Sequence, residues 1–182
     1  MVNMKDLHSI YTSADALELE KRESKIYFED VTNIQFTSGT TGYPKGASLT
    51  HFGILNNAYF LGENLKVTPD DKIVVSVPLY HCFGMVIGNL VCVNYGATQV
   101  YPCEGFDPKM ALEAVTKYNG TAIYGVPTMF VAYLEEYSKN KEKYDLSNLT
   151  KGYCAGSICP DVLMDRIINE LGIKDLLNCY GQ

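Results

Sequence analysis

The segment 37–46, TSGTTGYPKG, carries the residue types that hold a phosphate group. Gly39 and Gly42 permit the positive φ angles that turn successive backbone N–H groups toward one point, where they bind an anion. The Ser and Thr hydroxyls add hydrogen-bond donors, and Lys45 adds a positive charge. Loops of this composition are also common in ordinary hairpins and turns. The residue types alone therefore leave two interpretations open, a phosphate loop and a simple turn.

The same segment does not fit a Walker P-loop. That motif needs G-x-x-x-x-G-K-[ST] between a strand and a helix, whereas here a Pro precedes Lys45 and a Gly follows it. The flanking segments VTNIQFT (31–37) and GASLT (46–50) are short and contain the residue types that favour strands. We therefore expect a strand, a loop and a second strand.

Four further segments combine small and polar residues, and each follows a predicted strand. They are PLYHCFG (78–84), which contains His81, then GVPT (125–128), AGS (155–157) and YGQ (180–182). In open parallel α/β sheets, ligands bind beyond the carboxyl ends of the strands. We expect these four segments to meet at one edge of the sheet, which would place His81 at the edge where ligands bind.

The elements that must position these segments alternate between short apolar stretches and amphipathic ones. Strands are predicted over 71–77, 97–101, 121–125, 151–155 and 174–180. Helices are predicted over 51–65, 84–95, 107–118, 127–140 and 160–171, with Asp107 capping the third. This alternation predicts an α/β fold: a mainly parallel sheet flanked by helices, in three αβα layers.

Composition and charge exclude several classes of protein. Of the 182 residues, 47% are hydrophobic and 20% charged, which is typical of a globular domain. The formal net charge of −6 argues against a nucleic-acid partner, although one lysine and a few N–H groups suffice for a small anion. The six Cys and three His form no C-x-x-C or zinc pattern, so we expect reduced thiols. No stretch resembles a signal peptide or a membrane span, so we expect a cytoplasmic protein.

Several of these segments resemble motifs of one superfamily. FTSGTTGYPKG (36–46) resembles the AMP-binding signature of the adenylate-forming enzymes, which include acyl-CoA synthetases, nonribosomal-peptide adenylation domains and luciferases. PLYHCFG looks like the second motif of that family, AGSICP (155–160) like its adenine-side loop, and YGQ like the start of its Y-G-x-T-E motif. Ala155 stands where the family usually has the first of two glycines. The most similar members are medium- and long-chain acyl-CoA synthetases, the fatty-acid-CoA ligases.

The resemblance implies a reaction and roles for individual residues. Such ligases form an acyl-adenylate from a fatty or other carboxylic acid and Mg·ATP, and then pass the acyl group to coenzyme A as co-substrate. The β- and γ-phosphates of ATP would be held by Thr37, Ser38, Gly39, Thr40, Thr41, Gly42 and Lys45. The catalytic His81 would lie beside the carboxylate and the α-phosphate. The adenine would lie against Ala155, Gly156, Ser157, Tyr180 and Gly181, and the acyl pocket would include Gly125 and Val126.

The resemblance also implies a domain organisation. Residues 1–30 are expected to be an entry segment or linker, and residues 31–182 the central part of the large AMP-binding domain, ending before the Thr-Glu of Y-G-x-T-E. That Glu would bind Mg²⁺, so no metal ligand is expected in this chain. We therefore expect a ligase fragment that is inactive alone and self-associates through exposed surfaces. Two alternatives stay open, a stand-alone nucleotide-binding module and an unrelated α/β protein.

Overall fold

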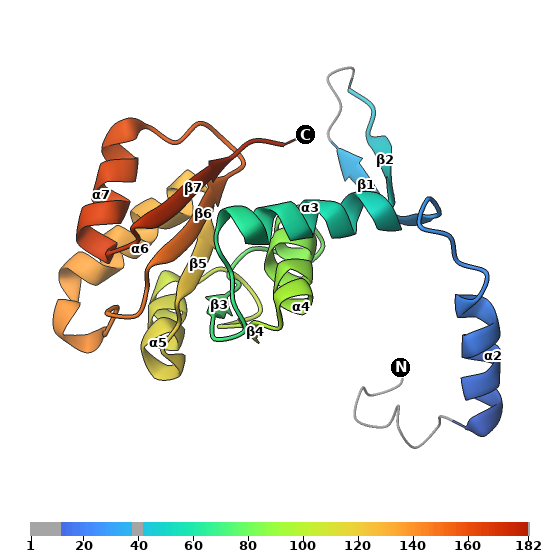
Figure 1. The fold of residues 1–182 in the computed structure, drawn as a ribbon. Coiled ribbons are helices and arrows are strands. Elements are labelled where there is room, and N and C mark those ends of the chain that lie inside the picture. The colour runs from blue at the N-terminus through green and yellow to red at the C-terminus, as the bar shows by residue number, and fades with distance from the viewer. Residues whose placement is uncertain (1–11, 38–41, 182) are drawn as a thin grey trace. The chain divides into compact units, whose positions relative to one another are not determined.

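The computed structural model describes residues 12–37 and 42–181. The chain divides into two compact units, Met1–Phe52 and Gly53–Gln182, and each is considered by itself. Figure 1 labels the helices and strands of both units.

The first unit contains a helix and a two-stranded sheet. Helix α2 (Ser13–Glu23) begins with a capping box, in which the Thr12 hydroxyl accepts the Asp15 N–H and the Asp15 carboxylate accepts the Thr12 N–H. Strands β1 (Val31–Thr37) and β2 (Lys45–Thr50) pair antiparallel, with Thr37 opposite Lys45. The two strands expected on either side of the Gly- and Thr-rich segment are therefore confirmed.

The second unit is built on a parallel sheet. Its five strands lie in the order β4 (Thr98–Val100), β3 (Lys72–Val74), β5 (Ala122–Gly125), β6 (Lys151–Ala155) and β7 (Asp175–Cys179), and all neighbouring pairs are parallel. The central strand β5 is buried along its whole length, as expected for a parallel sheet covered on both faces. The predicted parallel α/β sheet is confirmed, although β3 is shorter than the predicted strand 71–77.

Helices cover both faces of this sheet (Figure 1). On one face the centroids of the Tyr124 and Tyr153 rings lie 5.2 Å apart. Phe83, the first residue of η2 (Phe83–Leu90), stacks on Tyr124. The Tyr153 hydroxyl donates to the Leu61 carbonyl of α3 (His51–Asn64). Helix α4 (Val91–Tyr95) continues η2. On the other face lie α5 (Pro108–Tyr118), α6 (Pro127–Lys139) and α7 (Asp161–Leu171), and the short η3 (Lys141–Lys143) follows α6. The three αβα layers are those that the sequence predicts.

Local sequence signals set the ends of several helices. The Asp107 carboxylate accepts the Met110 N–H at 3.0 Å, and Pro108 occupies the first turn of α5, as predicted. Helix α7 ends at Gly172, whose φ of 82° lies in the left-handed region that glycine adopts without strain.

The predicted helix 84–95 differs from expectation in its hydrogen bonds. Residues Phe83–Leu90 form a π-helix, and the pattern continues to the Val91 N–H, which donates to the Val86 carbonyl five residues earlier. Only Val91–Tyr95 is α-helical. A π-segment of this kind is rare and is frequently found next to functional sites.

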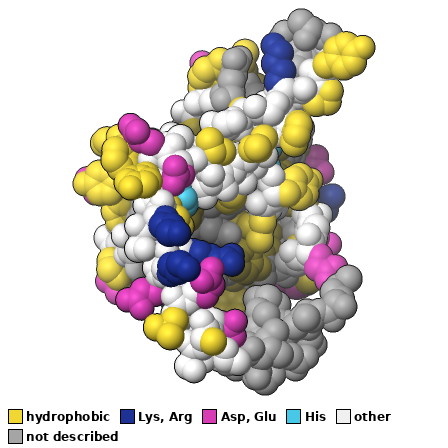
Figure 2. All heavy atoms as spheres, turned by 90° about the vertical axis from the view of Figure 1, so that its right-hand side faces the viewer, with side chains coloured by type: hydrophobic (Ala, Val, Ile, Leu, Met, Phe, Trp, Pro, Cys, Tyr) yellow, Lys and Arg dark blue, Asp and Glu magenta, His cyan; other side chains and the backbone are white. Residues whose placement is uncertain are grey.

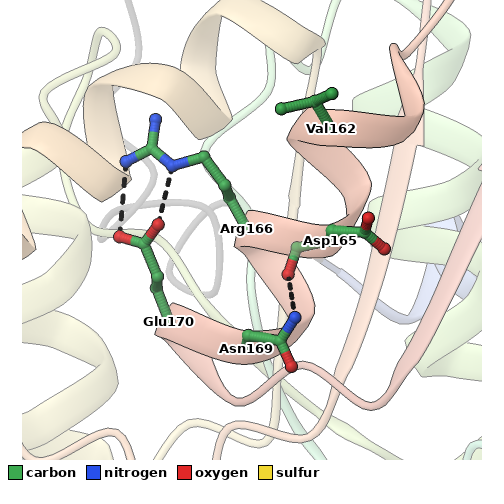
Figure 3. A pocket seen from close by; sticks show the side chains of 5 residues that line it. All are labelled: Val162, Asp165, Arg166, Asn169 and Glu170. Carbon is green, nitrogen blue, oxygen red and sulfur yellow. Dashed lines mark hydrogen bonds and ion pairs between the residues drawn. The ribbon is translucent and has the colours of Figure 1, made fainter.

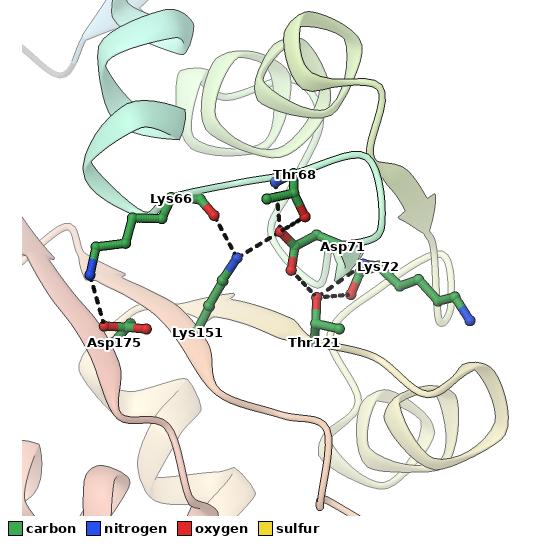
Figure 4. A network of polar contacts seen from close by, with 7 residues as sticks. All are labelled: Lys66, Thr68, Asp71, Lys72, Thr121, Lys151 and Asp175. Carbon is green, nitrogen blue, oxygen red and sulfur yellow. Dashed lines mark hydrogen bonds and ion pairs between the residues drawn. The ribbon is translucent and has the colours of Figure 1, made fainter.

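A buried carboxylate connects the amino ends of the sheet strands (Figure 4). Asp71, only 4% exposed, accepts hydrogen bonds from the Thr68 N–H at 2.7 Å, the Thr121 hydroxyl at 2.7 Å and the Lys151 ammonium at 2.7 Å. Thr121 directly precedes β5, and its hydroxyl accepts the Lys72 N–H at the start of β3. Lys151 begins β6 and also donates to the Lys66 carbonyl. This single group thus holds the starts of three strands together.

The network also stabilises the charge of Asp71. Burial alone would raise the pKa of its carboxyl, but the hydrogen bonds from Lys151, Thr121 and Thr68 outweigh burial and lower that pKa. A carboxyl whose pKa is lower in the folded than in the unfolded chain stabilises the fold above the unfolded value of about 4. That contribution is lost as the pH falls from there through the folded pKa.

Hydrophobic side chains are also exposed on the surface. Leu55, Tyr59 and Phe60 of α3 are each more than two-fifths exposed. Figure 2 shows hydrophobic side chains interspersed with charged ones on one face of the molecule. Within residues 12–37 and 42–181, no helix has the length and apolar character needed to cross a membrane.

Replacing Lys151 by Met should lower the free energy of unfolding by about 3 kcal/mol, because Asp71 would stay buried without its cation. The matched control is Lys109→Met, since Lys109 pairs with Glu113 where both side chains are more than half exposed. The control should change stability by less than about 1 kcal/mol. Urea unfolding at neutral pH measures both variants, and equal effects would contradict the assigned role of Asp71.

Candidate functional site

The candidate site of the second unit lies at the carboxyl edge of the sheet. Because its five strands are parallel, the segments that follow β3, β5, β6 and β7 all leave from the same edge. They include PLYHCFG, GVPT, AGS and the Tyr180–Gly181 part of YGQ. The topology therefore brings to one edge the four segments that the sequence singled out, in the place where open α/β sheets bind ligands.

A pocket of about 460 Å³ opens beside the ends of β6 and β7. Seven residues line it: Gly156, Ser157, Ile158, Asn178, Cys179, Tyr180 and Gly181. Four of them, Gly156, Ser157, Tyr180 and Gly181, are predicted adenine-site residues. Tyr180 is 89% exposed, so its ring is accessible for stacking on a planar group. The pocket thus offers an exposed aromatic ring to a planar group that enters it.

Sequence reasoning missed Asn178, which also lines the pocket. It is the exposed residue near the end of β7, whose neighbours Leu177 and Cys179 are half-buried. A polar residue after two leucines and two positions before Tyr180 is the signal that could have identified it. Its amide offers both donors and an acceptor to a base edge.

Gly156, which lines this pocket, also lies close to Val126, one of the two residues predicted to contact the acyl chain. Its φ of +88° favours glycine, and a Cβ at this position would lie 3.0 Å from Cγ1 of Val126. Val126 is half-buried and precedes α6, and Gly125 is the buried last residue of β5. Ala155, the remaining predicted adenine-site residue, is the buried last residue of β6 and is not among the residues that line the pocket.

His81 lies in a tight turn between β3 and η2. Its backbone N–H donates to the Pro78 carbonyl at 3.3 Å, and its own carbonyl accepts the Gly84 and Met85 N–H groups at 3.0 and 2.9 Å. Its ring Nδ1 accepts the Phe83 N–H at 3.0 Å. The side chain is exposed, so the turn fixes the ring while one side of it faces outward.

Gly84, which has no side chain, allows the start of η2 to lie directly against the Pro78 carbonyl. A Cβ at Gly84 would lie 2.2 Å from the Pro78 carbonyl oxygen, and one at Gly88 would lie 2.8 Å from Cγ1 of Val75. The π-helix therefore packs against the chain leaving β3 through two glycines, where no larger residue fits without movement.

In the first unit, the structure describes three of the seven predicted phosphate-binding residues. Thr37 ends β1, Lys45 begins β2 opposite it, and both are exposed. Gly42 adopts a φ of 84°, the positive angle expected for an anion-binding turn. The predicted residues Ser38, Gly39, Thr40 and Thr41 lie outside the described residues, as does Gln182.

None of the six cysteines, all of which the structure describes, forms a disulfide bond. Burial, with a smaller effect of the neighbouring Cys159, raises the pKa of Cys154 to about 12, and burial raises that of Cys179 to about 11. Protonated thiols are poor nucleophiles and poor metal ligands. Among the described residues, no three His, Cys, Asp or Glu side chains gather in a way that could hold a metal ion.

A second pocket, of about 280 Å³, lies along the surface of α7 (Figure 3). It is lined by Val162, Asp165, Arg166, Asn169 and Glu170. Arg166 donates to Glu170 at 2.6 and 3.3 Å, and the Asn169 amide donates to the Asp165 carbonyl. These are ordinary contacts one turn apart on a helix surface, so this pocket is the weaker candidate.

Comparison with known families adds a sequence relationship. The family model described as AMP-binding enzyme matches residues 4–182. The chain is 42% identical over 180 residues to a mitochondrial medium-chain acyl-CoA ligase, ACSF2, of Danio rerio, which covers 98% of this chain and 29% of that protein. It is 42% identical over 163 residues to the acyl-CoA ligase sidI of Aspergillus fumigatus, covering 90% of this chain and 27% of that protein. The chain thus spans less than a third of the length of these relatives.

Solved structures share the fold. A long-chain-fatty-acid-CoA ligase, FadD1, from Archaeoglobus fulgidus superposes with a TM-score of 0.72 at 29% identity, covering 85% of this chain and 32% of that one. ATP-bound MatB from Rhodopseudomonas palustris superposes with a TM-score of 0.74 at 26% identity, covering 86% and 30%.

Replacing Gly84 by Ala should lower the free energy of unfolding by about 1–3 kcal/mol, because the added methyl group collides with the Pro78 carbonyl. Gly105→Ala is the matched control, since a Cβ there meets nothing within 4 Å. Thermal unfolding compares the two variants. Equal melting temperatures would mean that the turn tolerates a wider packing than the geometry indicates.

Proposed function

Because this chain belongs to the family of AMP-binding enzymes, we propose that it is part of an ATP-dependent fatty-acid-CoA ligase. The whole ligase would form an acyl-adenylate from a carboxylic acid and ATP, release pyrophosphate, and transfer the acyl group to coenzyme A. Since the chain spans less than a third of its relatives' length, we assign that activity to a longer protein and none to the chain alone.

One observation carries the proposal. Of the seven residues that line the pocket at the carboxyl edge, four have an adenine role by the family resemblance: Gly156, Ser157, Tyr180 and Gly181. The same family model covers all of them. The pocket lies wholly within the second unit, so we propose that the chain binds AMP by itself, although it forms no acyl-CoA.

The other residues take the roles that their chemistry suits. Thr37, Lys45 and the loop between them would hold the β- and γ-phosphates, where preorganised donors and a cation stabilise developing charge. His81 would act at the carboxylate and the α-phosphate, and Gly125 and Val126 would contact the acyl chain. Mg²⁺ would neutralise phosphate charge, and we assign it no ligand among the described residues.

For the carboxylic acid substrate and the cellular location of the protein, we propose only a broad class. The Danio rerio relative is named a medium-chain ligase, and the Archaeoglobus fulgidus structure a long-chain one. We propose a fatty acid of medium or greater length. The cytoplasmic location expected from the sequence stays a proposal, since that relative is named mitochondrial.

The alternative function is a stand-alone nucleotide-binding module. A self-contained adenine pocket is the observation that favours it. An assay on the protein purified from its source cells separates the two, because only the ligase releases pyrophosphate in the presence of ATP, a fatty acid and coenzyme A.

Replacing Lys45 by Ala should weaken ATP binding by about 10-fold to 100-fold, because a charged hydrogen bond to the β- and γ-phosphates is lost. The affinity for AMP, which has neither phosphate, should stay unchanged. Isothermal titration of both nucleotides measures the difference, with Lys109→Ala as a control on an exposed helix. An equal loss for ATP and AMP, or no loss, would contradict the phosphate role of this loop.

Self-association is a separate prediction. The exposed Leu55, Tyr59 and Phe60 on α3 present apolar area that water solvates poorly. Light scattering over a concentration series should show growing particles. A monomer throughout the series would refute it.

A further inference from the structure

Strand β7 is an open edge of the parallel sheet. In the part of the chain that the structure describes, β7 pairs with β6 on one side and with no strand on the other. The opposite edge strand, β4, is only three residues long, and Pro102 follows it closely. By contrast, β7 has five residues, contains no proline or lysine, and pairs with β6 in continuous register. It therefore lacks the features that usually keep an edge strand from pairing with another chain.

Alternate residues of β7 direct their backbone groups to opposite sides of the strand. The Asp175 N–H donates to the Thr150 carbonyl at 2.9 Å, so Asp175 faces β6, as does every second residue after it. Leu176 and Asn178 therefore direct their N–H and C=O groups away from β6. The open edge presents the backbone groups of these two residues to water or to another strand.

We propose that the partner of this edge is a second copy of the same chain, which adds its own β7 antiparallel about a two-fold axis at Leu177. The two five-stranded sheets then continue as one. In this register Leu176 of each copy lies opposite Asn178 of the other, so the outward backbone groups meet as hydrogen-bonded pairs. Leu177 lies opposite its own counterpart, in a pair without hydrogen bonds.

The charges of the strand favour this antiparallel pairing. Lys174 and Asp175 both lie at the amino end of β7, so an antiparallel copy brings neither of them opposite itself. Asp175 lies opposite Cys179, and Lys174, one residue before the strand, lies opposite Tyr180, one residue after it. A parallel copy would instead place Asp175 opposite Asp175, and like charges directly opposite each other destabilise a sheet. The two-fold contact also uses the open edge of both copies, so it closes at two subunits.

The pairing brings Lys174 of the partner subunit to the pocket beside β6 and β7. Tyr180 lines that pocket and is 89% exposed, and Lys174 is exposed as well. Opposite residues have their Cβ atoms about 5 Å apart on the same face, so the ammonium group can reach the Tyr180 ring or an anionic group beside it. The pocket of each copy thus gains a cation from the other. The contact itself depends on the edge alone and not on nucleotide binding.

Sedimentation of the dilute chain is the first test. We expect a dimer with twice the chain mass of 20.3 kDa. Growth beyond two copies belongs to the exposed side chains of α3 and not to β7. A monomer at every concentration would overturn the proposal and leave the edge to a strand of the longer protein.

Charge at the two-fold position tests the register. In Leu177→Lys, and likewise in Leu177→Glu, two like charges lie directly opposite each other, so each variant alone should be a monomer. An equal mixture of the two should recover the dimer, because Lys then lies opposite Glu, and this recovery also shows that both variants fold. A dimer of either variant alone would overturn the two-fold register, as would a mixture of folded variants that stays monomeric.

A cysteine at the same position tests the contact without adding charge or bulk. Leu177→Cys places sulfur atoms at a pair whose Cα atoms lie about 4.5 Å apart, within the range of a disulfide. After mild oxidation with glutathione disulfide, peptide mass spectrometry should find the two introduced cysteines linked to each other. Leu176→Cys is the matched control, because its counterpart lies two residues further along the partner strand and should link far less. Equal linking in the two variants, or none in Leu177→Cys, would overturn the pairing.

Discussion

The Asp71 carboxylate is the group on which the second unit depends. It is buried, it carries charge, and its donors come from the chain before β3, from the residue before β5 and from the first residue of β6. A buried charge is tolerated only when its partners are in place, so the carboxylate penalises any shift of these strands against one another. The strands are three to five residues long, which leaves little length over which an error in register could be absorbed.

Because the strands are short and parallel, contacts that hold their amino ends in register also hold their carboxyl ends in register. The carboxyl ends of β3, β5, β6 and β7 each continue into a segment with candidate functional residues. Glycines then bring those segments close to their supports: Gly84 lies against the Pro78 carbonyl and Gly156 against Val126. The charge network thus lies at the amino edge and the candidate site at the carboxyl edge, where loops can vary without disturbing that network.

The sequence predicts most of the fold because its local signals agree with the final structure. The hairpin, the alternation of strands and helices, and the Asp107 cap all follow from short-range patterns. The structural features that the sequence does not predict depend on residues far apart in the chain or on small differences in backbone geometry. Asp71 and Lys151 are 80 residues apart, and no local pattern pairs them. The π-helix at Phe83–Leu90 has the same apolar residues that an α-helix would have, so periodicity alone could not separate the two. For the candidate site, the motifs single out Gly156, Ser157, Tyr180 and Gly181, which line the pocket. They do not single out Asn178, whose place in the pocket is visible only when β6 and β7 are side by side.

The parallel sheet also has a kinetic consequence. Parallel strands cannot be joined by a tight turn, so every pairing in the second unit waits for an intervening crossover, as when Ile73 meets Ala122 and Ala122 meets Lys151. Contacts between residues far apart in the chain slow folding, because much chain entropy is lost before they form. The hairpin β1–β2 needs only its own short loop. During synthesis we therefore expect the β1–β2 hairpin to be able to form early, and the pocket beside β6 and β7 to appear only when β7 joins the sheet.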